Sequence, residues 1–177
     1  MGKTRAGTVT EYGAQIDDMV RSIRKWKTEM DELPDSEETL RKCEDVFFGT
    51  ELSYITQPYE NEIIIDSMHH RLVHRYGILT GLLDDPGINE IMVNGPDRIY
   101  IEKERRLMRV DDAFTSVSEL EEVIRMFASA LHREINEANP IVDARLPSGY
   151  RVNGVLRTVA LNGPILTIRK FREKEIE

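Results

Sequence analysis

The sequence predicts an α+β protein, with an N-terminal helical segment followed by a mainly antiparallel sheet packed with helices. Up to about residue 80, apolar residues recur at three- and four-residue spacings, which is the period of an amphipathic helix. Beyond that point, short runs alternate apolar and polar residues between turn signals, as strands do. One helical stretch interrupts the strands, which indicates that helix and sheet form a single α+β arrangement.

The composition is that of a soluble protein with a buried core. Of its 177 residues 40% are hydrophobic and 32% are charged. No apolar run approaches the ~18–20 residues that a membrane span requires, and the N-terminal residues lack the apolar core of a signal peptide. The single Cys43 excludes an intramolecular disulfide and is typical of a reducing compartment. We therefore expect a cytoplasmic protein.

The first part of the chain is expected to be helical. Residues 1–10 are small and polar, and we expect a disordered tail there. A helical N-terminal region is expected over residues 11–60. Its first helix is predicted at Tyr12–Met30 because one stripe is mostly apolar. A second helix is predicted after Asp35, which forms an Asp-x-x-Glu capping pattern with Glu38.

The stretch Glu51–Tyr59 fits neither period, and we assign it no structure. An α+β domain is expected over residues 61–172. It would open with a helix at Asn61–Tyr76, for which Gly77 stands where a C-terminal cap belongs. A short apolar element at Ile78–Leu83 then precedes a strong turn signal.

Strands and one helix complete the predicted domain. Three strands are predicted at Ile88–Val93, Arg98–Lys103 and Arg106–Val110, with a hairpin turn at Glu104–Arg105. A helix then opens at Ser116 or Ser118, with an apolar stripe made by Val117, Leu120, Ile124, Phe127 and Leu131. A loop is predicted at Asn136–Pro140, and further strands follow it.

The C-terminal stretch is basic although the rest of the chain is acidic. Met1–Pro140 holds 17 Lys and Arg against 28 Asp and Glu, a balance of −11, whereas Ile141–Glu177 holds 7 against 4, a balance of +3. Five arginines stand in the basic stretch: Arg145, Arg151, Arg157, Arg169 and Arg172. Arginine concentrated at one end of an acidic chain predicts that it is presented to an anion.

The register of a predicted hairpin brings two of these arginines together. If Pro147–Gly149 is a three-residue loop with a left-handed glycine, Arg145 lies opposite Arg151 and the other face becomes apolar. A two-residue loop would mix the faces, so the three-residue loop is favoured. Opposed arginines repel each other, and an anion between them relieves this, since guanidinium suits phosphate. Arg169, on a later strand, could join them.

The alternative is that these arginines are solvated charges paired with nearby carboxylates. For any one arginine taken alone, this alternative is the better interpretation. For Arg145 and Arg151 together, with the charge contrast between the two parts of the chain, we favour the anion site.

Other patterns have simpler explanations. Gly2–Thr4 matches the end of a phosphate-binding P-loop, but the strand and first glycine that this motif requires are missing before it. His69, His70 and His74 lack the glutamate of a zincin motif and a third ligand. Cys43 has no paired ligand and is interpreted as a core residue. We predict no metal site and no complete nucleotide-hydrolysing site in this chain.

From about Ile63 onward the chain resembles the secretion-ATPase superfamily of type II and type IV secretion and type IV pilus motors. Three motifs in the same order carry the resemblance. They are Tyr-Gly-Ile-Leu-Thr-Gly-Leu-Leu-Asp-Asp-Pro-Gly-Ile-Asn-Glu-Ile-Met-Val-Asn-Gly (Tyr76–Gly95), Asn-Pro-Ile-Val-Asp-Ala-Arg-Leu-Pro-Ser-Gly-Tyr-Arg-Val-Asn (Asn139–Asn153) and Gly-Pro-Ile-Leu-Thr-Ile-Arg-Lys-Phe (Gly163–Phe171). The resemblance is strongest to the tight-adherence pilus branch, the CpaF-like proteins.

The resemblance implies a PAS-like N-terminal domain of a longer ATPase. A linker starting at about residues 173–177 would lead to a RecA-like C-terminal domain that carries the Walker A loop. The full-length protein would bind ATP and Mg²⁺, form a homo-hexamer, and work at the inner face of the cell membrane with an inner-membrane secretion or pilus platform protein. The phosphate-contacting candidates are Arg145, Arg151 and Arg169, with Arg157 and Arg172 as weaker candidates. Lacking a Walker A loop, the present chain is expected to hold no nucleotide and to be inactive alone.

Two other function classes are open at this point. One is a non-enzymatic protein-interaction module whose helical N-terminus docks a membrane partner. The other is a nucleic-acid-binding domain that uses the basic stretch. We disfavour the latter and expect no nucleic-acid partner, because only Tyr150 and Phe171 stand near the arginines as possible stacking platforms.

Overall fold

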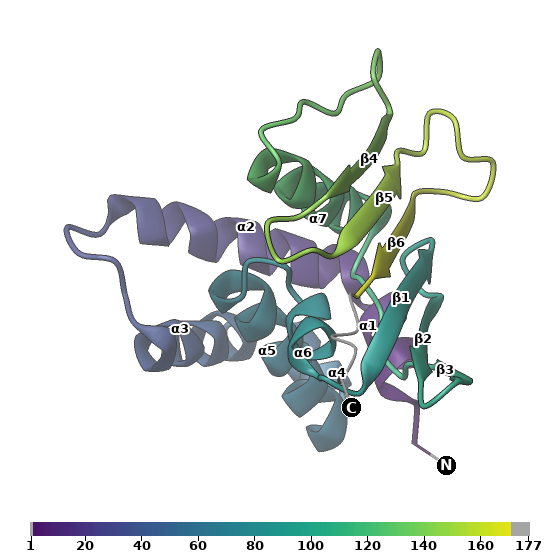
Figure 1. The fold of residues 1–177 in the computed structure, drawn as a ribbon. Coiled ribbons are helices and arrows are strands. Elements are labelled where there is room, and N and C mark those ends of the chain that lie inside the picture. Colours follow the sequence, from purple (N-terminus) through teal and green to yellow (C-terminus); the bar gives the residue numbers. More distant parts are fainter. Residues whose placement is uncertain (1, 171–177) are drawn as a thin grey trace. The chain divides into compact units, whose positions relative to one another are not determined.

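The computed structural model describes residues 2–170, and within this range the chain forms two compact units (Figure 1). We call them the helical unit, residues 2–80 and 112–116, and the sheet unit, residues 81–111 and 117–170. The predicted α+β class is confirmed. The expected boundary at residue 60 is wrong, because the helix after it belongs to the helical unit. Predictions for Phe171, Arg172 and residues 173–177 lie outside the described residues.

The helical unit follows the predicted helices closely. It contains α1 (Arg5–Glu11), α2 (Gly13–Glu29), α3 (Ser36–Phe48), α4 (Leu52–Ile55) and α5 (Pro58–Val73), and α6 (Leu79–Asp84) leads into the sheet unit. The predicted capping box is present. The Glu38 N–H donates to Asp35 Oδ1 at 2.8 Å, and the Asp35 N–H donates to Glu38 Oε2 at 3.0 Å. Two backbone donors of the first turn are thereby satisfied.

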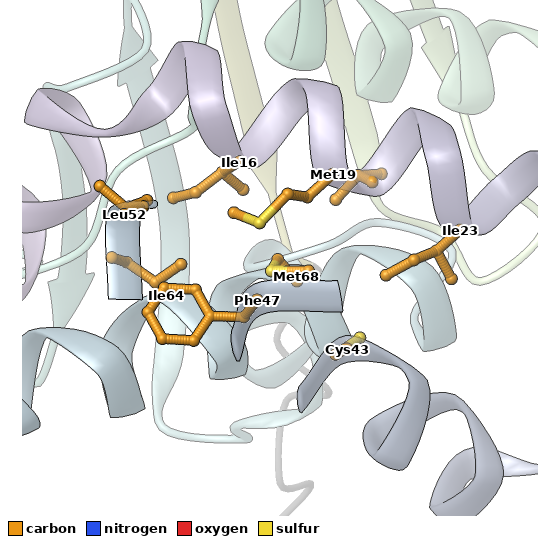
Figure 2. Packing of buried hydrophobic residues seen from close by; sticks show 9 residues of the cluster. Ile16, Met19, Ile23, Cys43, Phe47, Leu52, Ile64 and Met68 are labelled. Atoms are coloured by element: carbon orange, nitrogen blue, oxygen red, sulfur yellow. The ribbon is translucent and has the colours of Figure 1, made fainter. Parts of the chain in front are cut away.

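One apolar core joins α2, α3 and α5, which explains why residues 61–80 do not belong with the sheet. Figure 2 shows these side chains meeting from the facing helices. The buried cluster consists of Ile16, Met19, Val20, Ile23, Cys43, Phe47, Leu52, Ile64 and Met68. Because Ile64 and Met68 are fully buried in this cluster, α5 is bound to α2 and α3 by the burial of apolar surface.

The expected disordered tail at residues 1–10 is wrong, since α1 forms there. Thr4 caps it by accepting a hydrogen bond from the Gly7 N–H at 3.0 Å. Val9 is completely buried, and Arg5 pairs with Asp66 at 2.7 Å and with Asp112 at 2.9 Å. The polar composition of this segment concealed a cap and long-range ion pairs that hold the helix in place.

Gly77 does not cap the helix that precedes it. The helix α5 ends at Val73, three residues earlier than predicted, and its C-terminal cap is His74. Gly77 has a φ of 53° and lies in the following turn, where its N–H donates to the His74 carbonyl at 3.1 Å. The unassigned stretch before α5 contains the single turn of α4.

The short segment 112–116 returns the chain to the helical unit. Thr115 Oγ1 donates to Asp17 Oδ1 at 2.5 Å, and the largely buried Arg71 pairs with the same carboxylate. Burial alone would raise the pKa of Asp17, but hydrogen bonds from Thr115, Ser116 and Arg71 outweigh it and lower the pKa. The start of α2 touches this segment so closely that only a glycine fits at position 13.

The sheet unit is built on an antiparallel sheet in the order β3-β2-β1-β6-β5-β4, which has six strands within residues 81–170. The strands are β1 (Ile88–Asn94), β2 (Ile99–Lys103), β3 (Arg106–Arg109), β4 (Ile141–Arg145), β5 (Arg151–Val155) and β6 (Ile165–Arg169). The predicted strands are confirmed. So is the Glu104–Arg105 turn, where both residues have positive φ, at 52° and 64°, as a type I′ hairpin requires.

Strand alternation gives the sheet two different faces. On one face, Val152, Leu166 and Ile168 are essentially inaccessible to solvent, and α7 (Val117–Ala130) packs there. A Cβ on Gly154 would come within 2.9 Å of an Ile124 methyl carbon, so helix and sheet are in close contact. The opposite face carries the polar residues of β4, β5 and β6, and the candidate site lies on it.

Replacing Gly13 with alanine should destabilise the helical unit. A Cβ at this position would lie 1.9 Å from the Thr115 carbonyl oxygen, so the backbone has to move. We expect the free energy of unfolding to fall by about 1–3 kcal/mol, the usual cost of overpacking, as measured by urea denaturation followed by circular dichroism. Gly81→Ala is the matched control, since the space around Gly81 is open. If Gly13→Ala and Gly81→Ala lower the free energy of unfolding equally, the close contact between Gly13 and Thr115 is contradicted.

Candidate anion-binding site

The hairpin between β4 and β5 has the predicted three-residue loop. The Leu146 N–H donates to the Tyr150 carbonyl at 2.7 Å, and the Gly149 N–H donates to the Leu146 carbonyl at 2.8 Å. Gly149 has a φ of 90°, a conformation that glycine adopts at little cost. Arg145 therefore lies opposite Arg151, as predicted.

The next strand extends this register. Arg169 on β6 lies opposite Arg151 on β5, so Arg145, Arg151 and Arg169 form one row across three strands. We call it the arginine row. Neighbouring strands are ~4.8 Å apart, so the row is about 10 Å long at the backbone. A second row of Asp143, Asn153 and Thr167 runs beside it on the same face.

A pocket of about 340 Å³ lies over the second row and over Arg151 and Arg169 of the arginine row, while Arg145 stands outside its lining. It is lined by Asp143, Arg151, Asn153, Thr167 and Arg169. Guanidinium, amide and hydroxyl donors thus surround one space, together with a single carboxylate. This donor set suits an oxyanion such as phosphate, because an oxyanion accepts several hydrogen bonds at once.

Two arginines of the row are paired with carboxylates. Arg151 donates from Nε and Nη2 to the two carboxylate oxygens of Asp143, at 3.1 and 3.0 Å, in the forked geometry of a strong ion pair. These hydrogen bonds hold the pKa of Asp143 below its usual value. Arg169 donates from Nε to Glu90 Oε1 at 3.2 Å. The carboxylate pairing that we weighed as an alternative to the anion site is therefore present for two of the three arginines.

Arg145 differs from the other two arginines. It is exposed on the edge strand β4. Among residues 2–170 it makes no ion pair or side-chain hydrogen bond. Arg145 is therefore the member of the row without a carboxylate partner in the part of the chain that the structure describes.

The weaker candidates are not part of the row. Arg157 follows β5, and its Nε lies 3.6 Å from Glu121 Oε1, while its backbone N–H donates to the same oxygen at 3.2 Å. Arg157 thus has a partner on α7. Arg172 lies outside the described residues. Sequence reasoning missed Glu90, because its place beside Arg169 depends on the pairing of β1 with β6, for which no local signal exists.

The other side chains considered earlier have structural roles. His69 Nε2 lies 3.1 Å from Ser36 Oγ, and the His70 and His74 rings are 5.0 Å apart. In the described range, no group of three or more His, Cys, Asp or Glu could hold a metal ion. Cys43 is buried, which raises the pKa of its thiol to about 12. None of the helices described here has the length and apolarity needed to cross a membrane.

The model of a family described as "Type II/IV secretion system protein" matches residues 74–176. The chain belongs to this family. The match includes the strands of the arginine row, whereas α1 to α5 of the helical unit precede it.

Two curated relatives are similar to more than half of this chain. The conjugal transfer protein TrbB of Rhizobium radiobacter is 34% identical over 108 residues, 58% of this chain and 33% of TrbB. An uncharacterized protein of Methanocaldococcus jannaschii is 31% identical over 116 residues, 63% of this chain and 16% of that protein. This secretion-family chain thus spans from a sixth to a third of the length of these curated relatives.

A solved structure supports the fold. The VirB11 ATPase of the Brucella suis type IV secretion system, crystallised in complex with sulphate, superposes with a TM-score of 0.50 at 25% identity. The similarity covers 56% of this chain and 30% of VirB11. The fold and the family expected from the sequence motifs are therefore confirmed at the level of type II/IV secretion proteins.

Removing the Arg151 guanidinium should raise the pKa of Asp143. A carboxylate whose pKa is lowered by a partner stays ionised to lower pH, and it titrates closer to its ordinary value when that partner is lost. We expect an upward shift in Arg151→Ala, measured by NMR titration of the side-chain carboxyl carbon. Arg145→Ala is the matched control, because it removes an arginine of the same row and leaves both Arg151 hydrogen bonds to Asp143 in place. An unchanged Asp143 pKa in Arg151→Ala would disprove the pair.

Proposed function

We propose that this chain is the N-terminal regulatory and nucleotide-clamping region of an ATPase that powers pilus assembly or protein secretion. Its arginines would contact the phosphates of ATP held by a RecA-like C-terminal domain of the full-length protein. The observation that carries this proposal is the arginine row beside a polar pocket of about 340 Å³. The family membership supplies the context of secretion.

The chemistry suits a clamp better than a complete active site. Phosphoryl transfer spreads negative charge over the γ-phosphate oxygens, and positioned arginines stabilise that charge. This face of the sheet offers guanidinium, amide and hydroxyl donors, and the metal, P-loop and attacking water would come from the C-terminal domain. The sulphate complex of VirB11 supports the proposal, because sulphate is a tetrahedral oxyanion like phosphate.

The wider assignment follows from the sequence motifs. We place the parent protein in the CpaF-like branch that serves tight-adherence pili, as a homo-hexamer that uses ATP and Mg²⁺. It would work in the cytoplasm at the inner face of the membrane, against an inner-membrane platform protein. Residues 173–177 would begin the linker to the RecA-like domain, and nucleic acid would not be a partner.

Loss of either Arg145 or Arg151 should lower ATP turnover by the full-length protein. Arginine fingers contribute up to ~10³–10⁵ to the rate in other NTPases, and we expect a drop of about tenfold or more for each alanine variant. Steady-state phosphate release is the measurement, with urea unfolding to show that each variant remains folded. Arg106→Ala on the edge strand β3 is the matched control, because it removes an exposed arginine outside the row. Wild-type turnover in both row variants would refute the clamp.

A second candidate function is a protein-interaction module in the helical unit. Exposed apolar side chains stand at the end of α3, in α4 and at the start of α5, within twelve residues of sequence: Phe48, Tyr54, Ile55 and Tyr59. Tyr54 and Ile55 are 86% and 70% exposed. Grouped apolar side chains of this kind often mark protein contacts, which favours docking of the membrane platform protein by this unit.

This docking role needs a test that leaves the unit folded. Deleting residues 1–59 would remove most of the shared core, so the double variant Tyr54→Ser and Ile55→Ser is preferable. We expect about tenfold weaker binding of the platform protein in a pull-down from detergent-solubilised membranes, with unchanged urea unfolding. Leu33→Ser is the matched control, since Leu33 is 85% exposed in the loop between α2 and α3. Undiminished binding by the double variant would rule the patch out.

A further inference from the structure

The ion pairs of the arginine row divide its members into two kinds. Arg151 and Arg169 already donate to carboxylates of their own sheet, Asp143 and Glu90, whereas Arg145 has no such partner among residues 2–170. Among residues 2–170, an oxyanion that binds here therefore finds one guanidinium without a carboxylate partner and two that each have one.

We propose that Asp143 and Glu90 are built-in competitors for the anion, which binds first at Arg145 and then displaces Asp143 from Arg151 and Glu90 from Arg169. This inference rests on the proposed function, because it describes how the same phosphate site is regulated. The two carboxylates keep the row in a low-affinity state until a polyanion with several oxygens can replace both.

The geometry of the Asp143 pair supports direct competition. Asp143 uses both of its oxygens on Nε and Nη2 of Arg151, which are the paired donors that a phosphate group takes in a bidentate contact. One guanidinium edge cannot serve a carboxylate and a phosphate in this way at the same time. Asp143 also lines the pocket, where a bound anion would be close to its negative charge. The carboxylate therefore opposes the anion by occupation and by repulsion.

The exposure of the Arg151–Asp143 pair makes exchange possible there. The side chains of Arg151 and Asp143 are 61% and 44% exposed. Ion pairs in contact with water contribute little net stability, so the sheet does not depend on them. A buried pair would resist such an exchange, because separating its members leaves a charge without solvation.

Glu90 has the same relation to Arg169 on the other side of the row. It lies opposite Arg169 on the neighbouring strand β1 and is less exposed, at 19% of its side chain. One hydrogen bond at 3.2 Å joins the pair, against two for Asp143 and Arg151. Asp143 is thus the stronger competitor, and its removal gives the clearer test.

The test measures how tightly the 177-residue chain binds sodium tripolyphosphate, by isothermal titration calorimetry at low salt. Asp143→Asn keeps the shape of the side chain and removes its charge. We expect its Kd to fall about two- to fivefold, the range that exposed ion pairs allow. Asp97→Asn is the matched control, because it removes the same charge from the turn between β1 and β2 of the same sheet. An equal gain in both variants would overturn the proposal.

The Arg151→Ala background separates competition from general electrostatics. If Asp143 opposes the anion by occupying Arg151, Asp143→Asn no longer increases the affinity for tripolyphosphate in a protein that also carries Arg151→Ala. A gain of the same size in that background overturns the proposal, and so does weaker binding by Asp143→Asn alone, which would mean that Asp143 positions Arg151 for the ligand.

The proposed function fails separately from this inference. If the single variants Arg145→Ala and Arg151→Ala both bind tripolyphosphate as tightly as the wild type, the row is not a phosphate site and the clamp itself is lost. If Arg145→Ala and Arg151→Ala both bind tripolyphosphate more weakly, the clamp stands. If in addition Asp143→Asn binds it no more tightly than Asp97→Asn, only the competition by Asp143 is refuted. Urea unfolding of each variant shows that altered binding does not reflect lost structure.

Discussion

The hydrogen-bond register of β4, β5 and β6 decides where every side chain of the candidate site points. The left-handed Gly149 closes a three-residue loop, and this loop aligns β4 with β5. The same alignment directs Val152 and Ile168 to the buried face under α7. A slip of one residue would exchange the two faces, so the arginines would be buried and the apolar residues exposed. Burial of one face therefore maintains the arrangement of the other.

The electrostatics of the site follow from its position on an open sheet face. Three guanidinium groups in adjacent strands repel one another, yet in contact with water that repulsion is small. The carboxylates of Asp143 and Glu90 offset part of it, and both guanidinium partners stay in contact with water. An acidic chain can thus carry a concentrated positive row at modest cost, and it keeps the row in a form that a stronger anion can take over.

Sequence reasoning succeeded where the determining interactions are local. The loop containing Gly149, the capping box of Asp35 and Glu38, and the turn at Glu104 each depend on residues close in sequence, and all three were predicted. It failed where distant segments meet. The helix α1 is held by Arg5 through Asp66 and Asp112, and Glu90 reaches Arg169 across a pairing of remote strands.

The same distinction explains the misplaced boundary between the units. The apolar stripe of α5 was visible in the sequence, but a stripe does not reveal which surface will cover it. In the structure that surface belongs to α2 and α3, whose buried residues enclose Ile64 and Met68. Helical periodicity therefore predicted the helix α5 but did not predict that α2 and α3 would cover its apolar stripe.

The return of residues 112–116 to the helical unit has a consequence for how this chain can be divided. This unit is assembled from two separate stretches of sequence, and Thr115 and Asp112 add contacts to Asp17 and Arg5 beyond those made by Arg71 and Asp66. A gene fragment that stops at residue 80 encodes the helices and their apolar core without the polar contacts of residues 112–116. Recombination at a single point therefore cannot transfer the helical unit whole from one protein to another.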